Sequence, residues 1–417
     1  MLRVALSLLL FPTLPLHAAE SVATRIETEY RAKRQSALAA QWMEVKLPFE
    51  TPAAFLARLL DTARQGDSRA TAALGWEFHN KGDDLRARVW LGKSAERGNR
   101  FAAYLLGLLQ APGGAANTEA PLTVDWMKRA ADDGLPEAQF EMALRHALGK
   151  GAPLDPVAAR AWYARAAEQQ YAPALCNLAT MELQGSGGGV DLRRAEEHFR
   201  AAADAGFAQG NFGTGEALRL QNRLAEAADP YGRAAECGIV EADFWLGCIY
   251  REGVGRARDE REAAAHFLKA ALGGHQIAQA VTADVLRRGA GVPADPGAAA
   301  HWDAEIGRFT NAEVLATIGS LYLEGRLVQR DPAKALHFFR NAAERGQPNA
   351  QRLAGTLLAT GEAGERNLEE AYQWLWLAAR GGQTEAEPAF QAVLRSMDGR
   401  QIIQAAQRAS NFHPRTQ

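Results

Sequence analysis

The residues of this sequence with the greatest capacity for metal or redox chemistry are three cysteines and nine histidines. Cys237 and Cys248 stand closest together. On two successive helices they would lie roughly 15 Å apart along the helix axes, which is beyond the reach of a disulfide. Cys176 lies far from both in the sequence. We therefore interpret all three cysteines as small apolar residues of a helical core.

Several histidines recur at long intervals and do not share one helix turn. They are His198, His266, His301 and His337. No H-E-x-x-H or C-x-x-C motif accompanies them, so the sequence predicts neither a metal site nor a cofactor.

The stretch 185–189 reads GSGGG and has the composition of a phosphate-binding loop. It lacks the Lys-Ser/Thr pair with which such a loop contacts phosphate, so we interpret it as a linker between helices. The sequence also contains no Gly-x-Ser-x-Gly nucleophile motif. We therefore expect a protein without catalytic activity. A hydrolase whose nucleophile and base are brought together only by folding is the enzymatic alternative.

The elements that position these residues are clearest in the stretch 310–346, which reads TNAEVLATIGSLYLEGRLVQRDPAKALHFFRNAAERG. Val314, Ile318 and Tyr322 recur every four residues and predict one apolar face of a first helix. Gly319 lies between them and leaves room for a neighbouring backbone to come close. The sequence thus predicts a short amphipathic helix at the start of this unit.

A second helix is predicted after a loop that begins at Gly325. Asp331 and Pro332 are the residue types preferred at the N-cap and the first position of a helix. Its apolar stripe comprises Ala335, Phe338, Phe339, Ala342 and Ala343, and the helix ends at Gly346. One helix pair of this size cannot bury both stripes, so we expect copies of the unit on either side.

Such copies occur along most of the sequence. Taking the residue at the end of each unit as a mark, the marks are Gly66, Gly98, Gly134, Gln170, Gly206, Gly238, Gly274, Thr310, Gly346 and Gly382. They delimit nine units. The Asp-Pro cap returns at 155–156 and 295–296, and Asp191, Asp259 and Asn367 hold the same place without proline. The units that begin at Gly66 and Gly206 each lack four residues, which the pattern places in the loop between their helices.

This pattern resembles that of the Sel1-like repeat family, which is related to tetratricopeptide arrays. The residues that carry the resemblance are best seen as Ala242, Leu246, Gly247, Tyr250, Gly253, Gly255, Asp259, Ala263, Phe267, Ala270 and Ala271. The resemblance extends from about Gly66 to the C-terminus. It implies an all-α fold, a right-handed α-solenoid of about nine antiparallel helix pairs with N- and C-terminal capping helices.

The sequence predicts four segments. Residues 1–19 have the charge and apolar core of a secretory signal peptide, with cleavage after Ala18 or Ala19. Residues 20–65 form a lead-in and a capping helix, 66–382 the nine repeats, and 383–417 the C-terminal capping helices and a tail. We therefore expect an exported protein, located in the periplasm.

Composition and charge narrow the range of partners. The net charge is −2 and the pI is near 6.5, with no basic stripe, so we expect no nucleic acid as partner. Later stretches do not approach the length of apolar sequence that a membrane span needs, and no cysteine lies near the cleavage site. We therefore expect no stable membrane anchor. We also expect the protein to be a monomer.

In related arrays the first helices line the concave face, and this is where we predict the protein-binding surface. Aromatic residues mixed with Arg and acidic residues are typical of such a surface. Our candidates are Trp76, Tyr104, Glu141, Glu216, Arg219, Trp245, Arg251 and Arg287. Aromatic residues at helical spacing are also typical of a core, and this is the alternative for each of them.

The resemblance suggests two functions for an exported member without catalytic residues. The first is an immunity protein that binds a lipase or phospholipase toxin delivered by a type VI secretion system. The alternative is an envelope adaptor or regulator of exopolysaccharide, motility or adhesion machinery. We favour immunity because the sequence consists almost entirely of repeats behind an export signal.

Overall fold

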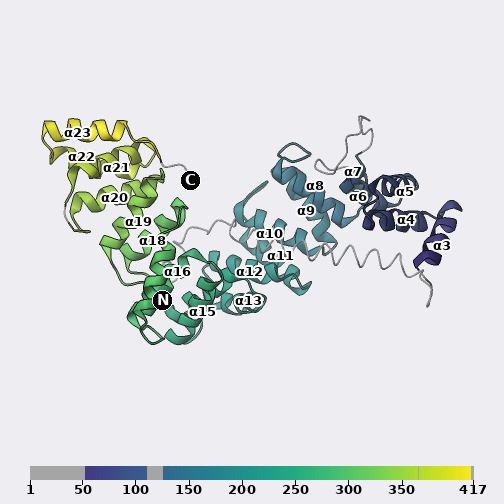
Figure 1. Ribbon diagram of the computed structural model, residues 1–417, viewed down its shortest axis with the longest axis horizontal. Helices are drawn as coiled ribbons and strands as arrows, with labels where there is room; N and C mark the ends of the chain where they lie inside the picture. The colour runs from purple at the N-terminus through teal and green to yellow at the C-terminus, as the bar shows by residue number, and fades with distance from the viewer. Residues whose placement is uncertain (1–51, 110–124, 365, 415–417) are drawn as a thin grey trace. The chain divides into compact units, whose positions relative to one another are not determined.

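The computed structural model describes residues 52–109, 125–364 and 366–414 (Figure 1). The predicted signal peptide, Thr51 and most of the lead-in lie outside the described residues. In the described part of the chain all regular elements are helices, from α3 to α23 with one short 3-10 helix, η1 (Thr384–Ala386). The all-α prediction is therefore confirmed.

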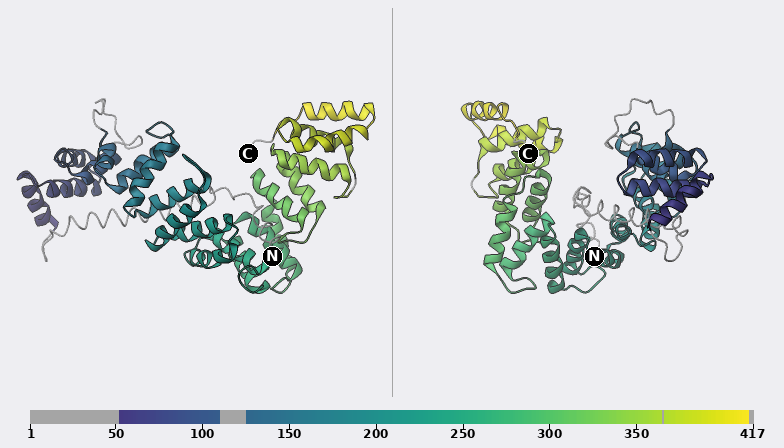
Figure 2. Two further views of the ribbon diagram at one scale, coloured as in Figure 1. Left: turned by 180° about the vertical axis from the view of Figure 1, so that it is seen from behind. Right: turned by 45° about the vertical axis from the view of Figure 1, so that its right-hand side comes forward.

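The helices alternate between the two types that the repeat predicts. The first helices are α4 (Ser68–Asn80), α6 (Arg100–Leu109), α8 (Pro136–Leu148), α10 (Ala172–Gln184), α12 (Ala208–Leu220), α14 (Val240–Glu252), α16 (Gln276–Arg288), α18 (Ala312–Glu324) and α20 (Pro348–Thr360). The second helices are α5 (Asp84–Glu96), α7 (Trp126–Asp132), α9 (Pro156–Glu168), α11 (Leu192–Asp204), α13 (Leu224–Glu236), α15 (Glu260–Leu272), α17 (Pro296–Ile306), α19 (Pro332–Ala343) and α21 (Leu368–Arg380). The two helices of each repeat pack on one another, and most second helices also pack on the first helix of the next repeat, as in an α-solenoid (Figures 1 and 2).

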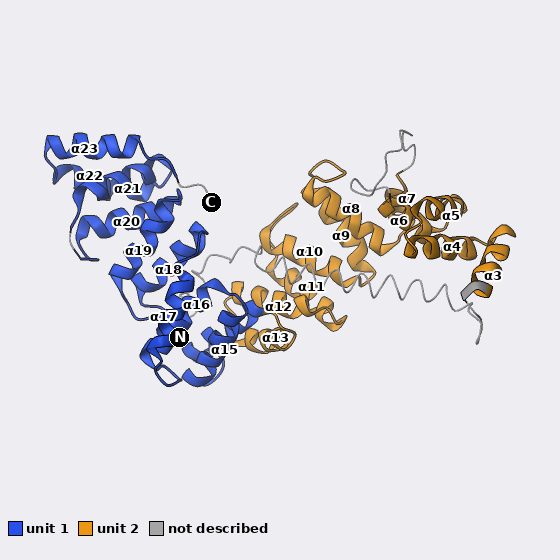
Figure 3. Ribbon diagram, in the orientation of Figure 1, with its two compact units in different colours: residues 1–12, 240–417 blue, residues 13–239 orange. Residues whose placement is uncertain are grey.

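The chain divides into two compact units, which are coloured separately in Figure 3. One holds the described residues up to Ile239, from α3 to α13. The other holds those from Val240 onward, from α14 to α23. We describe each unit by itself.

In each unit, first helices of successive repeats also contact one another. These contacts join α4 with α6 and α10 with α12 in one unit, and α16 with α18 in the other. Second helices of successive repeats do not approach one another as extensively in the described residues. The first helices therefore form the inner layer of each unit, where adjacent repeats lie closest.

Capping helices cover both ends of the described chain. At the N-terminal end, α3 (Pro52–Arg64) packs on α4 through Phe55, Leu59 and Ala63. At the C-terminal end, α22 (Glu387–Arg395) and α23 (Gly399–Ser410) pack on α21. Asp398 and Gln401 form a reciprocal capping box at the start of α23. These helices keep the apolar faces of the terminal repeats out of water.

The predicted helix caps are all present. The side chains of Asp155, Asp191, Asp259, Asp295, Asp331 and Asn367 each accept a hydrogen bond from a backbone N–H in the first turn of a second helix. The N–H of the capping residue itself is also used. That of Asp331, for example, donates to the carbonyl of Tyr322 at 2.8 Å and closes the loop onto the first helix. Each of these residues therefore satisfies polar groups of both helices in its repeat.

Two kinds of glycine explain why the repeat is so regular in sequence. Gly346, at the end of a unit, has φ of +84°, a conformation in which a Cβ is strained. Gly319, inside a first helix, would place a Cβ only 2.8 Å from the Phe339 ring. A close approach occurs at Gly319, but the neighbour is the aromatic ring of Phe339 in its own second helix and not the predicted backbone.

The two shortened units lack residues where the sequence predicts. Residues 81–83 and 221–223 join their helices, whereas 185–191 join α10 to α11. In the long loop, Gly187 lies directly on the start of the preceding second helix, since a Cβ there would meet the Pro156 carbonyl oxygen at 2.3 Å. A shortened loop cannot make this contact between repeats.

The interpretation of all three cysteines as core residues is partly wrong. Cys176 and Cys248 are buried, but Cys237 is exposed. The reason is its place at the C-cap of α13, one residue before Gly238, where the chain leaves the helix for solvent.

The unit from Val240 onward contains a buried histidine that the sequence did not single out. His275 caps α16, and its Nδ1 accepts a hydrogen bond from the N–H of Ala278 at 3.1 Å. Its ring stacks on Phe244 with centroids 4.4 Å apart. Burial lowers the pKa of His275 to about 4.

The unfolded chain binds this proton more readily than the folded chain, because an exposed histidine has a pKa of about 6.5. The contribution of His275 to stability is therefore present above pH 6.5 and is lost as the pH falls towards 4. We expect it to reduce the free energy of unfolding by about 2 kcal/mol at pH 5 relative to pH 7.

His275→Gln tests this, since Gln347 caps α20 from the same place in its own repeat. Urea unfolding at pH 7 and pH 5 should show a smaller loss of stability for the variant than for the wild type. An equal loss in both proteins would show that His275 is not the cause.

Candidate functional site

The eight predicted surface residues divide into two groups in the structure. Trp76, Glu141, Glu216, Arg251 and Arg287 are half-buried side chains of first helices. Tyr104, Arg219 and Trp245 are buried. The prediction that these last three lie outside the core is wrong, and a partner cannot contact them without a rearrangement.

Tyr104 is buried because α6 is covered on several faces. Helices α4, α5 and α7 all contact α6, and every residue from Phe101 to Gly107 is buried. A helix that is apolar on all sides belongs in a core, and the sequence of α6, RFAAYLLGLL, carries that signal. Trp245 is likewise part of a core, with its ring edge-on to that of buried Phe244 at 5.5 Å.

Arg219 is buried in a polar group with Glu216 and Tyr231. Its guanidinium donates to both carboxylate oxygens of Glu216, at 2.7 and 3.2 Å. The Tyr231 hydroxyl donates to the same carboxylate at 2.5 Å. Burial lowers the pKa of Arg219, but the charge and hydrogen bonds of Glu216 outweigh this effect and raise it. Burial also raises the pKa of Tyr231. Arg219 therefore orients Glu216, which is the member of the group that reaches the surface.

Arg251 lies at the C-terminal end of α14, and Arg287 and Arg288 lie at the C-terminal end of α16. The charge of Arg288 acts on Arg251, and we call these three residues the arginine cluster. Arg287 donates to Asp303 at 2.5 Å. Arg288 donates to buried Asp284 at 2.7 Å through Nε. Arg251 forms no hydrogen bond or ion pair within the described residues, and its Nη1 is enclosed without a partner. Burial and the nearby charge of Arg288 lower the pKa of Arg251.

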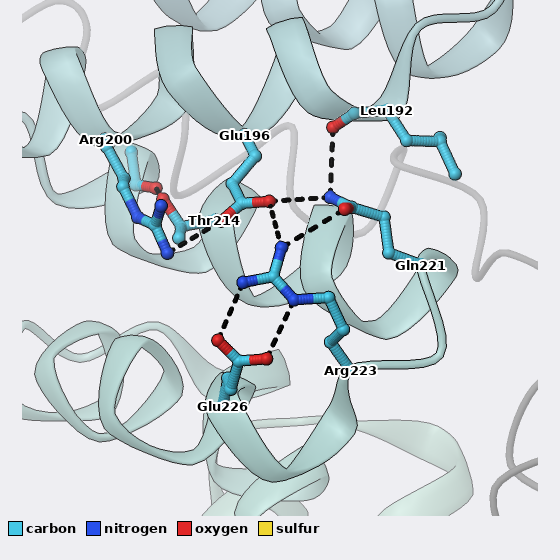
Figure 4. Close-up of polar contacts among 8 residues, drawn as sticks. Leu192, Glu196, Arg200, Thr214, Gln221, Arg223 and Glu226 are labelled. Atoms are coloured by element: carbon cyan, nitrogen blue, oxygen red, sulfur yellow. Dashed lines mark hydrogen bonds and ion pairs between the residues drawn. The ribbon is translucent and has the colours of Figure 1, made fainter.

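A second polar group, which sequence reasoning missed, surrounds Glu196 in the other unit (Figure 4). We call it the Glu196 network. The buried carboxylate of Glu196 accepts hydrogen bonds from Gln221 at 2.7 Å and from Arg223 at 2.8 Å, and pairs with Arg200 at 2.7 Å. Arg223 also donates two hydrogen bonds to the carboxylate of Glu226, at 2.7 and 2.8 Å.

The Glu196 network replaces a missing loop. Gln221 and Arg223 belong to the short connection 221–223, and their side chains reach back to the preceding second helix, α11. Gln221 also donates to the carbonyl of Leu192, the first residue of α11, at 3.2 Å. The long loops cover the equivalent end of a helix with backbone. The signal in the sequence was the four-residue deletion together with polar residues at its site.

Two of the recurring histidines each pair with a single carboxylate. His198 Nδ1 lies 2.8 Å from Glu182, and His266 Nδ1 lies 2.7 Å from Asp243. No group of three or more His, Cys, Asp or Glu side chains is placed to hold a metal ion in the described part of the chain. None of the helices in residues 52–109, 125–364 and 366–414 combines the length and apolar character of a membrane span.

The architecture defines a helical repeat scaffold whose inner layer of first helices carries the half-buried polar groups. A comparison with protein-family models finds the Sel1 repeat in eight stretches: 68–99, 100–135, 136–171, 172–207, 240–275, 276–302, 315–347 and 348–383. These cover more than half of the sequence, and the chain belongs to the Sel1 repeat family. Such repeats typically serve as non-catalytic scaffolds for protein–protein interaction. Residues 208–239 are not matched, although they form the regular helix pair α12 and α13.

Solved structures support the fold. One is a protective antigen of uropathogenic Escherichia coli with an SLR fold, with a TM-score of 0.58 and 21% identity over 94% of each chain. Another is a Sel1 repeat protein of Oxalobacter formigenes, with a TM-score of 0.50 and 26% identity over 72% of this chain and 88% of that one.

A curated relative adds sequence similarity over a shorter stretch. It is an uncharacterized protein of Neisseria meningitidis serogroup B, 28% identical over 156 residues. The aligned stretch is 37% of this chain and 32% of the relative, so the chain spans about a third of the length of the curated relative that it matches.

Proposed function

We propose that this chain is an exported scaffold that binds another protein on the inner layer of first helices. Within that class, we propose an immunity protein that neutralises a lipase or phospholipase toxin of a type VI secretion system in the periplasm. The observation that carries the binding role is the set of half-buried aromatic and charged side chains on the first helices. It includes Arg251, which forms no hydrogen bond or ion pair within the described residues.

Such side chains suit protein binding. Large interfaces combine a few enclosed aromatic or Arg anchors with a surrounding of weaker polar contacts. Trp76 and Arg287 are of the anchor types, and Glu141 and Glu216 supply acidic groups on the same kind of helix. Trp76, Glu141 and Glu216 lie in the unit up to Ile239, and Arg251 and Arg287 lie in the unit from Val240 onward. Positions repeated along a solenoid in this way give a surface that suits a folded partner.

The immunity role rests on the resemblance and on the export signal predicted at residues 1–19. Inhibition would be steric: the scaffold covers the entrance to the active site of the toxin and contributes no reactive group. Tight inhibition of this kind needs an interface of at least about 1,000 Å² and slow dissociation.

Co-expression tests the proposed partner. Cells that export a candidate lipase or phospholipase toxin to the periplasm should survive when the full chain is produced, and die when it is absent. Combined Trp76→Ala and Arg287→Ala changes should weaken protection, because both side chains are half-buried on the inner layer. Cys237→Ser, at an exposed helix end outside that layer, should not weaken it.

Two results would contradict the immunity role. One is unchanged toxicity for every candidate enzyme encoded beside this gene. The other is a pull-down from periplasmic extract, with residues 20–417 as bait, that recovers envelope assembly proteins in stoichiometric amounts. The second result would make the chain an adaptor.

A further inference from the structure

The guanidinium of Arg251 is not satisfied by the described part of the fold. Its Nη1 is enclosed and has no hydrogen-bond partner in the part of the chain that the structure describes. An enclosed guanidinium N–H without an acceptor costs free energy, more than a neutral donor does, because the group has lost its hydration. Side chains of this kind are usually satisfied by a protein group, by ordered water or by a bound ligand.

Asp284 and Glu260, the carboxylates whose charge acts on Arg251, are already engaged. Asp284 accepts from Nε of Arg288 at 2.7 Å and from the N–H of Gln329 at 3.2 Å, and it is buried. Glu260 accepts from Nη2 of Arg258. Neither carboxylate bonds to Arg251, so all the N–H groups of the Arg251 guanidinium can still donate to a partner.

The local charge favours an incoming anion. Two carboxylates, Glu260 and Asp284, act on the charge of Arg251. Each is paired with another arginine, Glu260 with Arg258 and Asp284 with Arg288, so the charge of Arg251 has no carboxylate of its own among the described residues. The charge of Arg288 opposes that of Arg251 and lowers its pKa, an effect that a bound anion would reverse. The side chains of Arg287 and Arg288 are about one-third exposed, so an anion from solvent can approach them.

We propose that the arginine cluster binds a carboxylate side chain, a Glu or Asp in an acidic segment of the partner protein. A planar carboxylate matches the forked N–H groups of a guanidinium and can accept two parallel hydrogen bonds. The site lies on the inner layer, at the ends of the adjacent first helices α14 and α16. The inference rests on the proposed protein-binding function and names the chemistry of the partner at this point.

The test uses the chain without its signal peptide, residues 20–417, and a fluorescent hexaglutamate peptide with both termini blocked, so that only side-chain carboxylates are available. Fluorescence anisotropy should show saturable binding that weakens as salt rises. Arg251→Met should weaken binding about tenfold or more, the size expected for the loss of charge-assisted hydrogen bonds. Arg251→Lys keeps the charge without the forked N–H groups, so its affinity for the peptide should lie between those of the wild type and Arg251→Met.

Arg308→Met is the matched control. Arg308 lies in the same unit, pairs only with Glu305 in the described residues, and has a 73% exposed side chain. Its loss should change the affinity less than twofold. Equal weakening by Arg251→Met and Arg308→Met, no saturable binding by the wild type, or tighter binding of inorganic phosphate at the cluster would each overturn the carboxylate site. Hydrogen exchange in α14 and α16 should be the same in all variants.

This result can be separated from the fate of the proposed function. The peptide assay needs no toxin, so the carboxylate site can stand even if no lipase partner is found. If the wild type protects cells from a toxin and Arg251→Met protects equally well, the immunity role stands and the proposed contact is wrong.

Discussion

Phe267→Ala should destabilise the unit from Val240 onward by about 3–5 kcal/mol, the usual cost of deleting a fully buried aromatic ring. Phe267 has no exposed surface, and its ring lies 6.0 Å from that of Phe244. It also fills the space beside Gly247 of the adjacent first helix. Urea unfolding should show the loss, and hydrogen exchange should place it in α14, α15 and α16.

The same contact predicts that two substitutions will not be additive. A Cβ at Gly247 would lie 2.7 Å from Cδ1 and Cε1 of Phe267, so Gly247→Ala alone should destabilise by about 1–3 kcal/mol. In the Phe267→Ala background the ring is gone. There Gly247→Ala should be neutral or stabilising by up to about 1 kcal/mol, the helix propensity of Ala over Gly.

Gly92→Ala is the matched control for the double-mutant cycle. Gly92 also lies inside a helix, α5, but a Cβ there meets no atom within 4 Å. It should stabilise by about 0.5–1 kcal/mol in either background. If Gly247→Ala has the same effect with and without Phe267, the packing of the Phe267 ring is not the reason why position 247 requires glycine.

The repeat could be predicted from sequence because the interactions that define each helix pair lie within one unit. Capping residues such as Asp331 act on the N–H groups of the next turn, and Gly319 meets a ring of its own unit, Phe339. Both interactions lie within one unit, so the spacing in the sequence reports them directly. Nine repetitions in phase then make the pattern hard to mistake.

The candidate surface was harder to predict because it depends on contacts between units. One amphipathic stripe assigns a single buried face to a first helix. In the solenoid, a first helix such as α6 is covered by α4, α5 and α7, so Tyr104 is buried although it lies outside that stripe. Arg219 is buried for another reason, since Glu216 and Tyr231 supply the partners that a charge needs away from water.

The Glu196 network shows how a shortened repeat keeps its place in the array. Residues 208–239 are the unit that the family model does not match. Their short loop cannot cover the preceding second helix, and Gln221 and Arg223 reach α11 with side chains instead. If these bonds join the two repeats, removing the shared carboxylate should loosen both.

Glu196→Ala should therefore destabilise the unit up to Ile239 by about 2–4 kcal/mol. The estimate follows from the loss of several charge-assisted hydrogen bonds to a buried acceptor. Hydrogen exchange should accelerate in α11, α12 and α13, while α4 and α5 keep their protection, because repeats of a solenoid depend mainly on their neighbours.

Arg223 supplies its own control, because it holds two carboxylates in different surroundings. Glu196 has a 5% exposed side chain, whereas that of Glu226 is 55% exposed. Exposed ion pairs contribute little to stability, since water and salt screen them. Glu226→Ala should leave unfolding almost unchanged although it removes two hydrogen bonds from the same guanidinium. Equal effects of the two substitutions would mean that burial of Glu196 does not set the strength of this contact, and that the short repeat is held by its apolar core alone.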